Sequence, residues 1–398
     1  MRHRTLTFIV LCVAAIGVIS WISGHLRAPS PPEHSTGEMT IADAVRAIGA
    51  GTATSPIVGE QPRRGKPSLT FVAKADGAVP PRIVSDATGW GERADGNFDT
   101  NVGVMTRVPG TDWYSLDVKV EPYSRIEYLI AYGPGDFRLD PHNPRKVQRV
   151  AGPASEVVMQ GYVPPQEFVD PAPARPIPLI DEAVPSRAIG ATRRVITYLP
   201  PEFDRARVYP VAVFHDGALV VNNGEAPRVL DWLIAKQAIE PIVAVFVDPV
   251  SRTDDFKRGA PMRTFVTTEL FNYLSTRATI SSDAQKRAII GISAGARGAL
   301  DAASATRVFG LLGLMIPALT EDDVIAIPPS SNHTIRASIL SAHYDALNVD
   351  AARSAQLTLV DQGQQVTYKE VPEGHTTATW RLHLRDVLID LFGPHIRR

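Results

Sequence analysis

The C-terminal half of the chain consists of continuous apolar runs that alternate with helix-like segments. The apolar runs are residues 195–199, 211–214, 242–247, 288–290 and 311–316. Runs of this kind suit parallel strands that are buried on both faces of a sheet. The helix-like segments between them are residues 229–236, 265–274 and 296–305. Because strands alternate with helices, the pattern predicts a parallel sheet covered by helices, an α/β fold, for residues 191–396.

Residues 66–165 show a different pattern, in which apolar and polar side chains alternate along short runs. Residues 114–120 and 126–132 are two such runs, and Gly, Pro and Asp separate the short runs of this region as a whole. A period of two predicts a small antiparallel β-sandwich. A chain of 398 residues also has room for two domains, since a domain contains roughly 100–200 residues. Proline-rich stretches predict a flexible linker at residues 28–65 and an extended connector at residues 166–190.

The N-terminus has a short basic start followed by an apolar run. Residues 6–22 contain no charged side chain. This pattern predicts either a cleaved signal peptide or a membrane anchor over residues 1–27. We therefore expect an exported protein, periplasmic or otherwise extracytoplasmic, with membrane association through residues 6–22 if the segment is not cleaved. A short helix around residues 39–48 fits the linker that follows.

Composition excludes several classes of function. The net charge of −1 provides no electrostatic basis for binding nucleic acid. The single cysteine, Cys12, lies in the N-terminal apolar run, so the folded part has no disulfide, no Cys-ligated zinc and no Cys nucleophile. The acidic run Glu321-Asp322-Asp323 is interpreted as the start of a helix and not as a metal site. We therefore expect no metal and no cofactor.

Gly291-Ile292-Ser293-Ala294-Gly295 matches the pattern Gly-x-Ser-x-Gly. A buried strand precedes it and an alanine-rich helix follows, which is the setting of a nucleophile elbow. The glycines allow the strained turn to pass close to its neighbours, and the serine oxygen then projects from the top of the sheet at the helix N-terminus. We interpret Ser293 as the nucleophile of an α/β-hydrolase fold. The alternative is an ordinary N-cap serine.

The other members of a catalytic triad follow the nucleophile in this fold, first the acid and then the histidine. His375 lies in a loop between the strand 366–371 and the last helix, and it is the candidate base. Asp345 follows the preceding strand and would orient the imidazole. Asp350 and Asp361 compete with it, as an expected helix N-cap and as a residue near the end of the same helix.

An oxyanion hole needs two backbone amides that point at the same place. The residue after the nucleophile, Ala294, supplies one of them in this fold. The second amide should come from the tight turn after the strand 211–214. That turn makes Gly217 or Ala218 the expected donor.

With these residues the chain resembles the enterochelin-esterase-like family over roughly residues 66–396. The motifs that carry the resemblance are Pro109-Gly110-Thr111-Asp112-Trp113, Arg125-Ile126-Glu127-Tyr128, Asp140-Pro141-His142-Asn143-Pro144, Tyr198-Leu199-Pro200-Pro201 and Glu373-Gly374-His375. The resemblance implies an Ig-like domain, similar to starch-binding-type sandwiches, ahead of an α/β-hydrolase esterase domain. The family's serine, histidine and acid correspond to Ser293, His375 and Asp345.

The chain departs from the family pattern at Ala296, where a glycine is frequent, and at Thr377, where an aromatic residue is frequent. These departures bear on the substrate and not on the triad. Arg252 lies in a polar segment that loosely resembles a pocket segment of the family. We assign Arg252 to substrate binding together with Asp216 and His215, the last as a structural or pocket-lining residue.

The sequence therefore predicts an exported serine esterase that hydrolyses a carboxylic ester without a cofactor. The expected substrate is a small-molecule or glycan ester, either a siderophore ester of the enterochelin type or an ester of the envelope or of a polysaccharide. Three alternatives stay open at this point: an acyltransferase with the same triad, a peptidase on the same fold, and a glycan-binding protein without catalysis.

Overall fold

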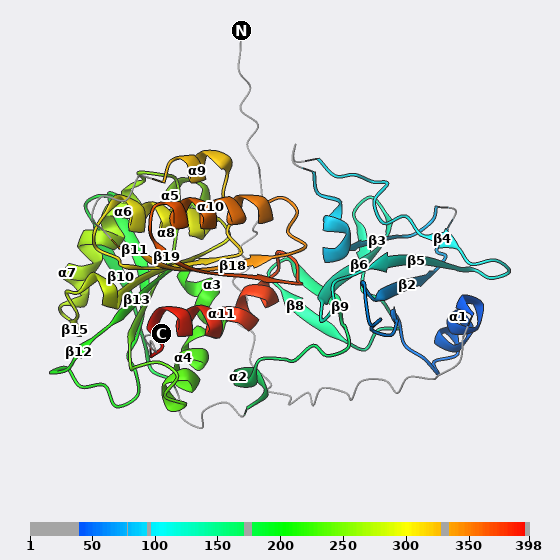
Figure 1. The fold of residues 1–398 in the computed structure, drawn as a ribbon, viewed down its shortest axis with the longest axis horizontal. Coiled ribbons are helices and arrows are strands. Elements are labelled where there is room, and N and C mark those ends of the chain that lie inside the picture. Colours follow the sequence, from blue (N-terminus) through cyan, green and yellow to red (C-terminus); the bar gives the residue numbers. More distant parts are fainter. Residues whose placement is uncertain (1–39, 78, 94–96, 171–176, 328–333, 395–398) are drawn as a thin grey trace, which may run out of the picture. The chain divides into compact units, whose positions relative to one another are not determined.

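The computed structural model describes residues 40–77, 79–93, 97–170, 177–327 and 334–394 (Figure 1). The compact unit to which they belong runs from Thr40 to Arg398. The predicted signal peptide or anchor, residues 1–27, and the first part of the predicted linker, residues 28–39, lie outside the described residues. Within the described residues, no helix has the length and apolar character needed to cross a membrane.

The N-terminal part of this unit, residues 40–170, is called the β region below. Its elements are α1 (Ile41–Gly49), β1 (Ile57–Val58), β2 (Ser68–Lys74), β3 (Arg82–Ser85), the 3-10 helix η1 (Asp86–Gly91), β4 (Thr106–Arg107), β5 (Trp113–Lys119), β6 (Arg125–Gly133), β7 (Asp136–Arg138), β8 (Lys146–Arg149), β9 (Gly152–Val158) and α2 (Gln166–Val169). The strands form two antiparallel sheets, in the orders β1-β2-β5-β4 and β3-β6-β9-β8, with β7 paired to β6.

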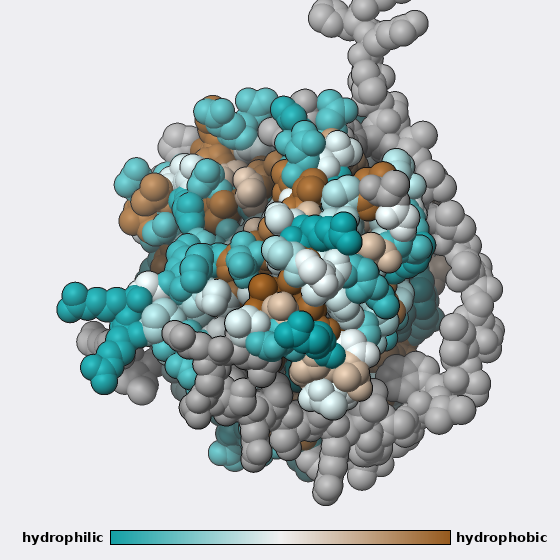
Figure 2. All heavy atoms as spheres, turned by 90° about the vertical axis from the view of Figure 1, so that its right-hand side faces the viewer, coloured by the Kyte–Doolittle hydropathy of each residue, from teal (hydrophilic) through white to brown (hydrophobic). Residues whose placement is uncertain are grey.

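The two sheets of the β region share one apolar core. Leu69 and Phe71 of β2 pack with Ile126, Tyr128 and Ile130 of β6. The predicted alternation of residues 126–132 therefore correctly identified the side chains of β6 that face this core. On the side of the molecule that Figure 2 shows, hydrophobic and hydrophilic residues are interspersed. The immunoglobulin-like topology of this region stays a prediction.

Residues 40–58 pack against the sheets of the β region and do not form a flexible linker. Thr40 caps α1 by accepting a hydrogen bond from the amide of Asp43. The buried face of α1, which includes Val45 and Ile48, lies in one cluster with Trp113 of β5. The predicted linker was wrong for these residues, because the apolar face of α1 covers side chains that the sheet would otherwise expose. The short helix expected around residues 39–48 is confirmed.

The rest of the described chain is called the α/β region. Its elements are β10 (Leu179–Ser186), β11 (Ala191–Tyr198), β12 (Val208–Tyr209), β13 (Val211–His215), α3 (Gly217–Asn222), α4 (Ala226–Ala235), β14 (Val243–Val247), α5 (Arg252–Asp255), α6 (Pro261–Thr264), the π-helical turn η2 (Phe265–Glu269), α7 (Leu270–Leu274), β15 (Thr279–Ile280), the 3-10 helix η3 (Ala284–Lys286), β16 (Arg287–Ile292), α8 (Ala294–Ala305), β17 (Leu311–Met315), α9 (Glu321–Ile325), β18 (Arg336–Ala342), α10 (Val349–Asp361), β19 (Gln365–Val371) and α11 (Thr377–Phe392).

An eight-stranded sheet in the order β10-β11-β14-β13-β16-β17-β18-β19 forms the centre of the α/β region. The pairs β10-β11 and β11-β14 are antiparallel, and all pairs from β14 to β19 are parallel. Helices α3, α4 and α11 cover one face, and α8 and α10 cover the other (Figure 1). The predicted α/β-hydrolase type of fold is confirmed.

Both faces of the parallel strands are buried, which explains the continuous apolar runs. In β13, Val211 and Val213 belong to the core under α8, whereas Ala212 and Phe214 belong to the core under α4 and α11. Successive side chains of a strand point to opposite faces. A strand between two helical layers therefore needs an apolar residue at every position.

The predicted connector at residues 166–190 contains the first strand of the sheet. β10 pairs with β11 along its whole length, from Leu179 to Ser186. The expected start of the α/β region at residue 191 was therefore wrong. As an edge strand β10 has half of its residues exposed, and it includes Pro185, which a central strand would not tolerate. Its sequence consequently lacks the apolar run by which the other strands were recognised.

The packing of α1 predicts that residues 40–65 stabilise the β region. A chain that begins at Lys66 should have a free energy of unfolding at least about 2 kcal/mol below that of a chain that begins at Thr40, because Val45 and Ile48 lose their partners and Trp113 is exposed. Denaturant titrations of the two chains measure the difference. Equal midpoints with equal slopes would contradict the packing role of α1.

Candidate active site

Ser293 lies in a strained turn between β16 and α8. Its φ of 54° and ψ of −121° are values that residues other than glycine rarely adopt. A Cβ atom on Gly291 would lie 2.1 Å from the carbonyl oxygen of Gly295. A Cβ atom on Gly295 would lie 2.7 Å from a carboxylate oxygen of Asp216. Both glycines of the motif are therefore required by close approach, as expected for a nucleophile elbow.

Neighbouring strands and loops hold this turn through its backbone. The amide of Ser293 donates a hydrogen bond of 3.0 Å to the carbonyl of Met315 at the end of β17. The carbonyl of Ser293 accepts bonds of 3.1 Å from Ala296 and from Ala318. With both backbone groups of Ser293 engaged, the side chain can remain in its strained position at the N-terminus of α8.

The structure brings the three predicted triad residues together. Nε2 of His375 lies 2.9 Å from Oγ of Ser293, and Nδ1 of His375 lies 2.6 Å from Oδ2 of Asp345. Asp345 follows β18 and His375 follows β19, two adjacent parallel strands whose C-terminal ends lie at the same edge of the sheet. The other oxygen of Asp345 accepts a hydrogen bond of 2.8 Å from Asn348. Three residues that are distant in sequence are thus joined in one chain of hydrogen bonds, with His375 between Ser293 and Asp345.

The two competing aspartates lie elsewhere. Asp350 is in the first turn of α10, where its exposed side chain pairs with Arg353. The sequence had suggested Asp350 as the N-cap of this helix, but the N-cap is Asn348. Asp361 is the last residue of α10 and is also exposed. Among the three candidates, only Asp345 contacts His375.

Two of the three expected oxyanion donors fit the structure. Ala294 and Gly217 are the first residues of α8 and α3, and amides of a first helical turn have no partner within their helix. The amide of Ala218 donates a hydrogen bond of 2.5 Å to Asp248. The prediction of Ala218 as an oxyanion donor was therefore wrong, because its N–H already donates to Asp248. A Cβ atom on Gly217 would lie 2.6 Å from the backbone of Phe246, so this position also needs glycine.

Asp216 and His215 lie beside Gly295, in the turn that carries Ser293. Asp216 is 3% exposed and forms a two-point ion pair with Arg252, with distances of 2.7 Å and 2.9 Å. Burial raises the pKa of Asp216, and the charge of Arg252 opposes this shift. The same guanidinium donates to the carbonyl of Ile292, the residue before Ser293. Asp216 and Arg252 thereby brace the turn on both sides of the nucleophile.

His215 is 1% exposed and its ring packs against Phe256. Burial lowers the pKa of His215 to about 4, so the ring is neutral at pH 7. Burial also removes His215 and Asp216 from direct contact with a substrate, in contrast to the assignment from the sequence. The Arg252 side chain is 44% exposed, and substrate binding by this residue stays a prediction.

The sequence did not identify the residues of the β region that lie near the triad. Glu92 follows η1, and burial raises its pKa while the charge of His375 opposes the shift. Arg125 and Glu127 of β6 alternate with the core residues Ile126 and Tyr128, a spacing that is typical of a face exposed to solvent. They are buried instead, since this face of β6 is covered as well. In the α/β region, Nε2 of His383 lies 2.8 Å from Oε1 of Glu373.

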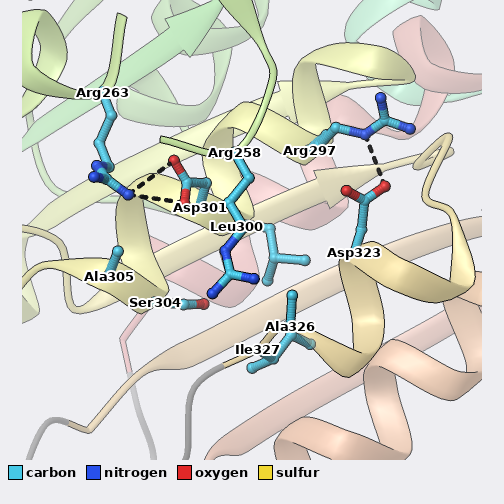
Figure 3. Close-up of a pocket in the computed structure, with 10 residues that line it drawn as sticks. All are labelled: Arg258, Arg263, Arg297, Leu300, Asp301, Ser304, Ala305, Asp323, Ala326 and Ile327. Atoms are coloured by element: carbon cyan, nitrogen blue, oxygen red, sulfur yellow. Dashed lines mark hydrogen bonds and ion pairs between the residues drawn. The ribbon is translucent and has the colours of Figure 1, made fainter. Parts of the chain in front are cut away.

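No group of His, Cys, Asp and Glu side chains in the described part of the chain is arranged to hold a metal ion. A pocket lies between α8 and α9 (Figure 3), but its lining includes no member of the triad. In this pocket Asp301 pairs with Arg263 and Asp323 pairs with Arg297.

Comparison with known proteins agrees with this geometry. Residues 186–320 match the family model described as "Putative esterase". This match covers about a third of the chain and supports a carboxylic ester hydrolase. The matched residues include the strained turn with Ser293 and end before Asp345 and His375. No curated protein sequence matches the chain.

Solved structures of enterobactin esterases share the fold of this esterase. The enzyme from Shigella flexneri with 2,3-dihydroxy-N-benzoyl-serine is 20% identical and has a TM-score of 0.64, over 83% of this chain and 94% of that chain. Ferric enterobactin esterase from Salmonella typhimurium is 19% identical, with a TM-score of 0.65 over 83% and 95%. Enterochelin esterase from Shigella flexneri is 17% identical, with a TM-score of 0.65 over 90% and 98%.

The resemblance to the enterochelin-esterase-like family that the motifs indicated is thus confirmed, and so is the classification as a carboxylic ester hydrolase. The coverage extends beyond the α/β region, so the shared fold includes part of the β region. At these identities the likeness concerns the fold, and the substrate has to be argued separately.

The close approach at the elbow predicts that Gly291→Ala destabilises the esterase by at least about 3 kcal/mol, because the added methyl group meets backbone that cannot move aside. Thermal unfolding of the purified variant measures this loss. Gly133→Ala is the matched control, since a Cβ atom there meets nothing within 4 Å. Equal melting temperatures of the two variants would contradict the close packing described for the turn.

Proposed function

We propose that this esterase is a serine hydrolase in which Ser293, His375 and Asp345 form the catalytic triad. The observation that carries the proposal is the chain of hydrogen bonds from Asp345 to His375 and from His375 to Ser293, at 2.6 Å and 2.9 Å. This arrangement matches the roles of nucleophile, general base and orienting acid. The strained turn adds support, because such strain is maintained where it presents a functional group.

The proposed reaction begins when Oγ of Ser293 attacks the acyl carbon of the ester. Nε2 of His375 accepts the serine proton, and Asp345 stabilises the resulting imidazolium. The amides of Ala294 and Gly217 stabilise the oxyanion of the tetrahedral intermediate. His375 then donates the proton to the leaving alcohol, and an acyl group remains on Ser293. Water, activated by the same histidine, releases the acid in a second attack.

For the substrate we propose a small-molecule ester. Enterobactin esterases with this fold have been solved with enterobactin and with 2,3-dihydroxy-N-benzoyl-serine. This likeness supports siderophore esters as the first class to test, with esters of the envelope or of a polysaccharide as the second class. The N-terminal pattern of residues 1–27 supports export, so the substrate would be met outside the cytoplasm.

Replacement of the nucleophile tests the proposal directly. Ser293→Ala should abolish ester turnover and covalent labelling by a fluorophosphonate, with a loss of several orders of magnitude in kcat and no change in fold. Hydrolysis of 4-nitrophenyl acetate and gel fluorescence after labelling measure the two effects. Ser304→Ala, on the same helix, is the matched control and should keep both. Labelling that persists in Ser293→Ala would refute the assignment.

The acid of the triad can be separated from its neighbour by paired substitutions. Asp345→Asn should lower kcat by about 10⁴-fold, because an amide favours the wrong tautomer of His375 and removes the counter-charge of the imidazolium. Asp350→Asn should leave kcat nearly unchanged, since this side chain is exposed and pairs only with Arg353 among the described residues. Steady-state kinetics on one ester compares the two. The reverse ranking would show that Asp345 is not the acid.

A further inference from the structure

The loop that carries Asp345 is bound to the β region by its neighbour Tyr344. The hydroxyl of Tyr344 accepts a hydrogen bond of 2.7 Å from the amide of Glu121 and lies 3.0 Å from Oγ of Ser124. Both partners belong to the turn between β5 and β6. Its ring also packs against the core of the β region. Tyr344, which belongs to the loop that carries Asp345, is thus held by polar and apolar contacts to the β region.

The loop that carries His375 is bound to Arg125, the first residue of β6, directly after this turn. The amide of Arg125 donates a hydrogen bond of 3.3 Å to the carbonyl of Pro372. The guanidinium of Arg125 lies 3.5 Å from the carboxylate of Glu373, and both side chains are 1% exposed. The carbonyl of Glu373 accepts a bond of 3.0 Å from the amide of Tyr344. This last bond joins the histidine loop to the acid loop.

The other end of Glu373 is fixed within the α/β region. Its second oxygen lies 2.8 Å from Nε2 of His383 in α11. Burial alone would raise the pKa of Glu373, but the hydrogen bond from His383 and the charge of Arg125 hold this pKa below its usual range. Glu373 is therefore a carboxylate that connects β6 to α11, two residues before the base of the triad.

Gly374, directly before His375, lies against Asp86 of η1. A Cβ atom on Gly374 would be 2.0 Å from Oδ1 of Asp86. Asp86 is held in turn by the indole N–H of Trp90 at 2.8 Å and by the amide of Glu127 at 2.7 Å. The backbone of the histidine loop therefore rests on a rigid part of the β region, and only glycine permits this approach.

The charges around Arg125 indicate that its contact with Glu373 has a positional role. Glu127 and Glu156, both in the β region, lie 2.7 Å and 2.6 Å from Arg125 and already compensate its buried charge. A buried cation needs partners, but these two suffice to neutralise it. The longer contact with Glu373 is thus not required for neutralisation, and it fixes the position of the histidine loop.

From these contacts we propose that the β region is part of the catalytic machinery, as a clamp that positions the loops of Asp345 and His375 through Tyr344 and Glu373. The clamp rests on the proposed triad. Tyr344 and Glu373 are positioning residues, because neither touches the reacting atoms. Within the α/β region, the described contacts of the two loops include those with β18, β19, α10 and the start of α11.

Loss of the clamp should slow the chemical step more than it weakens substrate binding. A displacement of about 1 Å of a catalytic group can lower the rate by about 10²-fold. The distances from His375 to Ser293 and to Asp345 are the quantities at risk. Substrate contacts made by other loops would be unaffected, so kcat should fall while KM changes little.

The test uses the full chain with Tyr344→Phe and Glu373→Gln. Phenylalanine keeps the ring in the core, and glutamine keeps the shape of the side chain while Arg125 retains two carboxylates. With 4-nitrophenyl acetate, each variant should show kcat at least about tenfold lower and KM within about twofold of the unchanged chain. The rate of fluorophosphonate labelling of Ser293 should fall in parallel.

Tyr368→Phe is the matched control, because the Tyr368 hydroxyl bonds to Glu370 of its own strand, β19. Its kcat should stay within about twofold. Full kcat in both Tyr344→Phe and Glu373→Gln would overturn the clamp while leaving the triad intact. An unchanged chain that neither hydrolyses the ester nor labels at Ser293 would instead refute the proposed function. Melting temperatures identify a variant that fails to fold, and in that case the other variant decides.

Discussion

The strained backbone of Ser293 is the constraint on which the rest of the site depends. A positive φ at a serine is unfavourable, so the surrounding structure has to maintain it. Gly291 and Gly295 permit the close approach of backbone, and the parallel strand β17 receives the amide of the nucleophile. The parallel sheet between two helical layers is what places a strand on each side of this turn. Nucleophile, helix N-terminus and oxyanion amides all take their positions from it.

The base and the acid depend on a second set of contacts. Ser293 is fixed by the centre of the sheet, whereas Asp345 lies on the loop after β18, the strand next to the edge, and His375 lies on the loop after the edge strand β19. An edge strand has neighbours on one side only, and its loops are correspondingly less supported. The β region supplies the missing support through buried polar contacts at Tyr344, Glu373 and Gly374. In this view the two sheet regions form one catalytic unit and not an enzyme with an attached module.

Several features were predictable because local sequence carries them. Continuous apolar runs indicated the parallel strands, and the glycines of the elbow indicated a close turn. Position in the loops after two late strands indicated His375 and Asp345 as the candidate partners of Ser293. The failures have a common physical cause. β10 is an edge strand in which half of the residues are exposed, and α1 covers part of a sheet. Each of these depends on what packs against the segment, which local pattern does not contain.

The sequence by itself determined the class of fold and indicated the candidates for the proposed triad, because these follow from hydrophobic period, glycine placement and the position of loops after the strands. Only the tertiary structure decided which amide beside Gly217 is available, since the bond from Ala218 to Asp248 joins two segments that are distant in sequence. It also decided that Asp216 pairs with Arg252 beside the turn of Ser293. The contacts of the loops of Asp345 and His375 with the β region were likewise decided by the tertiary structure. Buried polar partners are chosen by three-dimensional proximity, and for that reason no run of neighbouring residues reveals them.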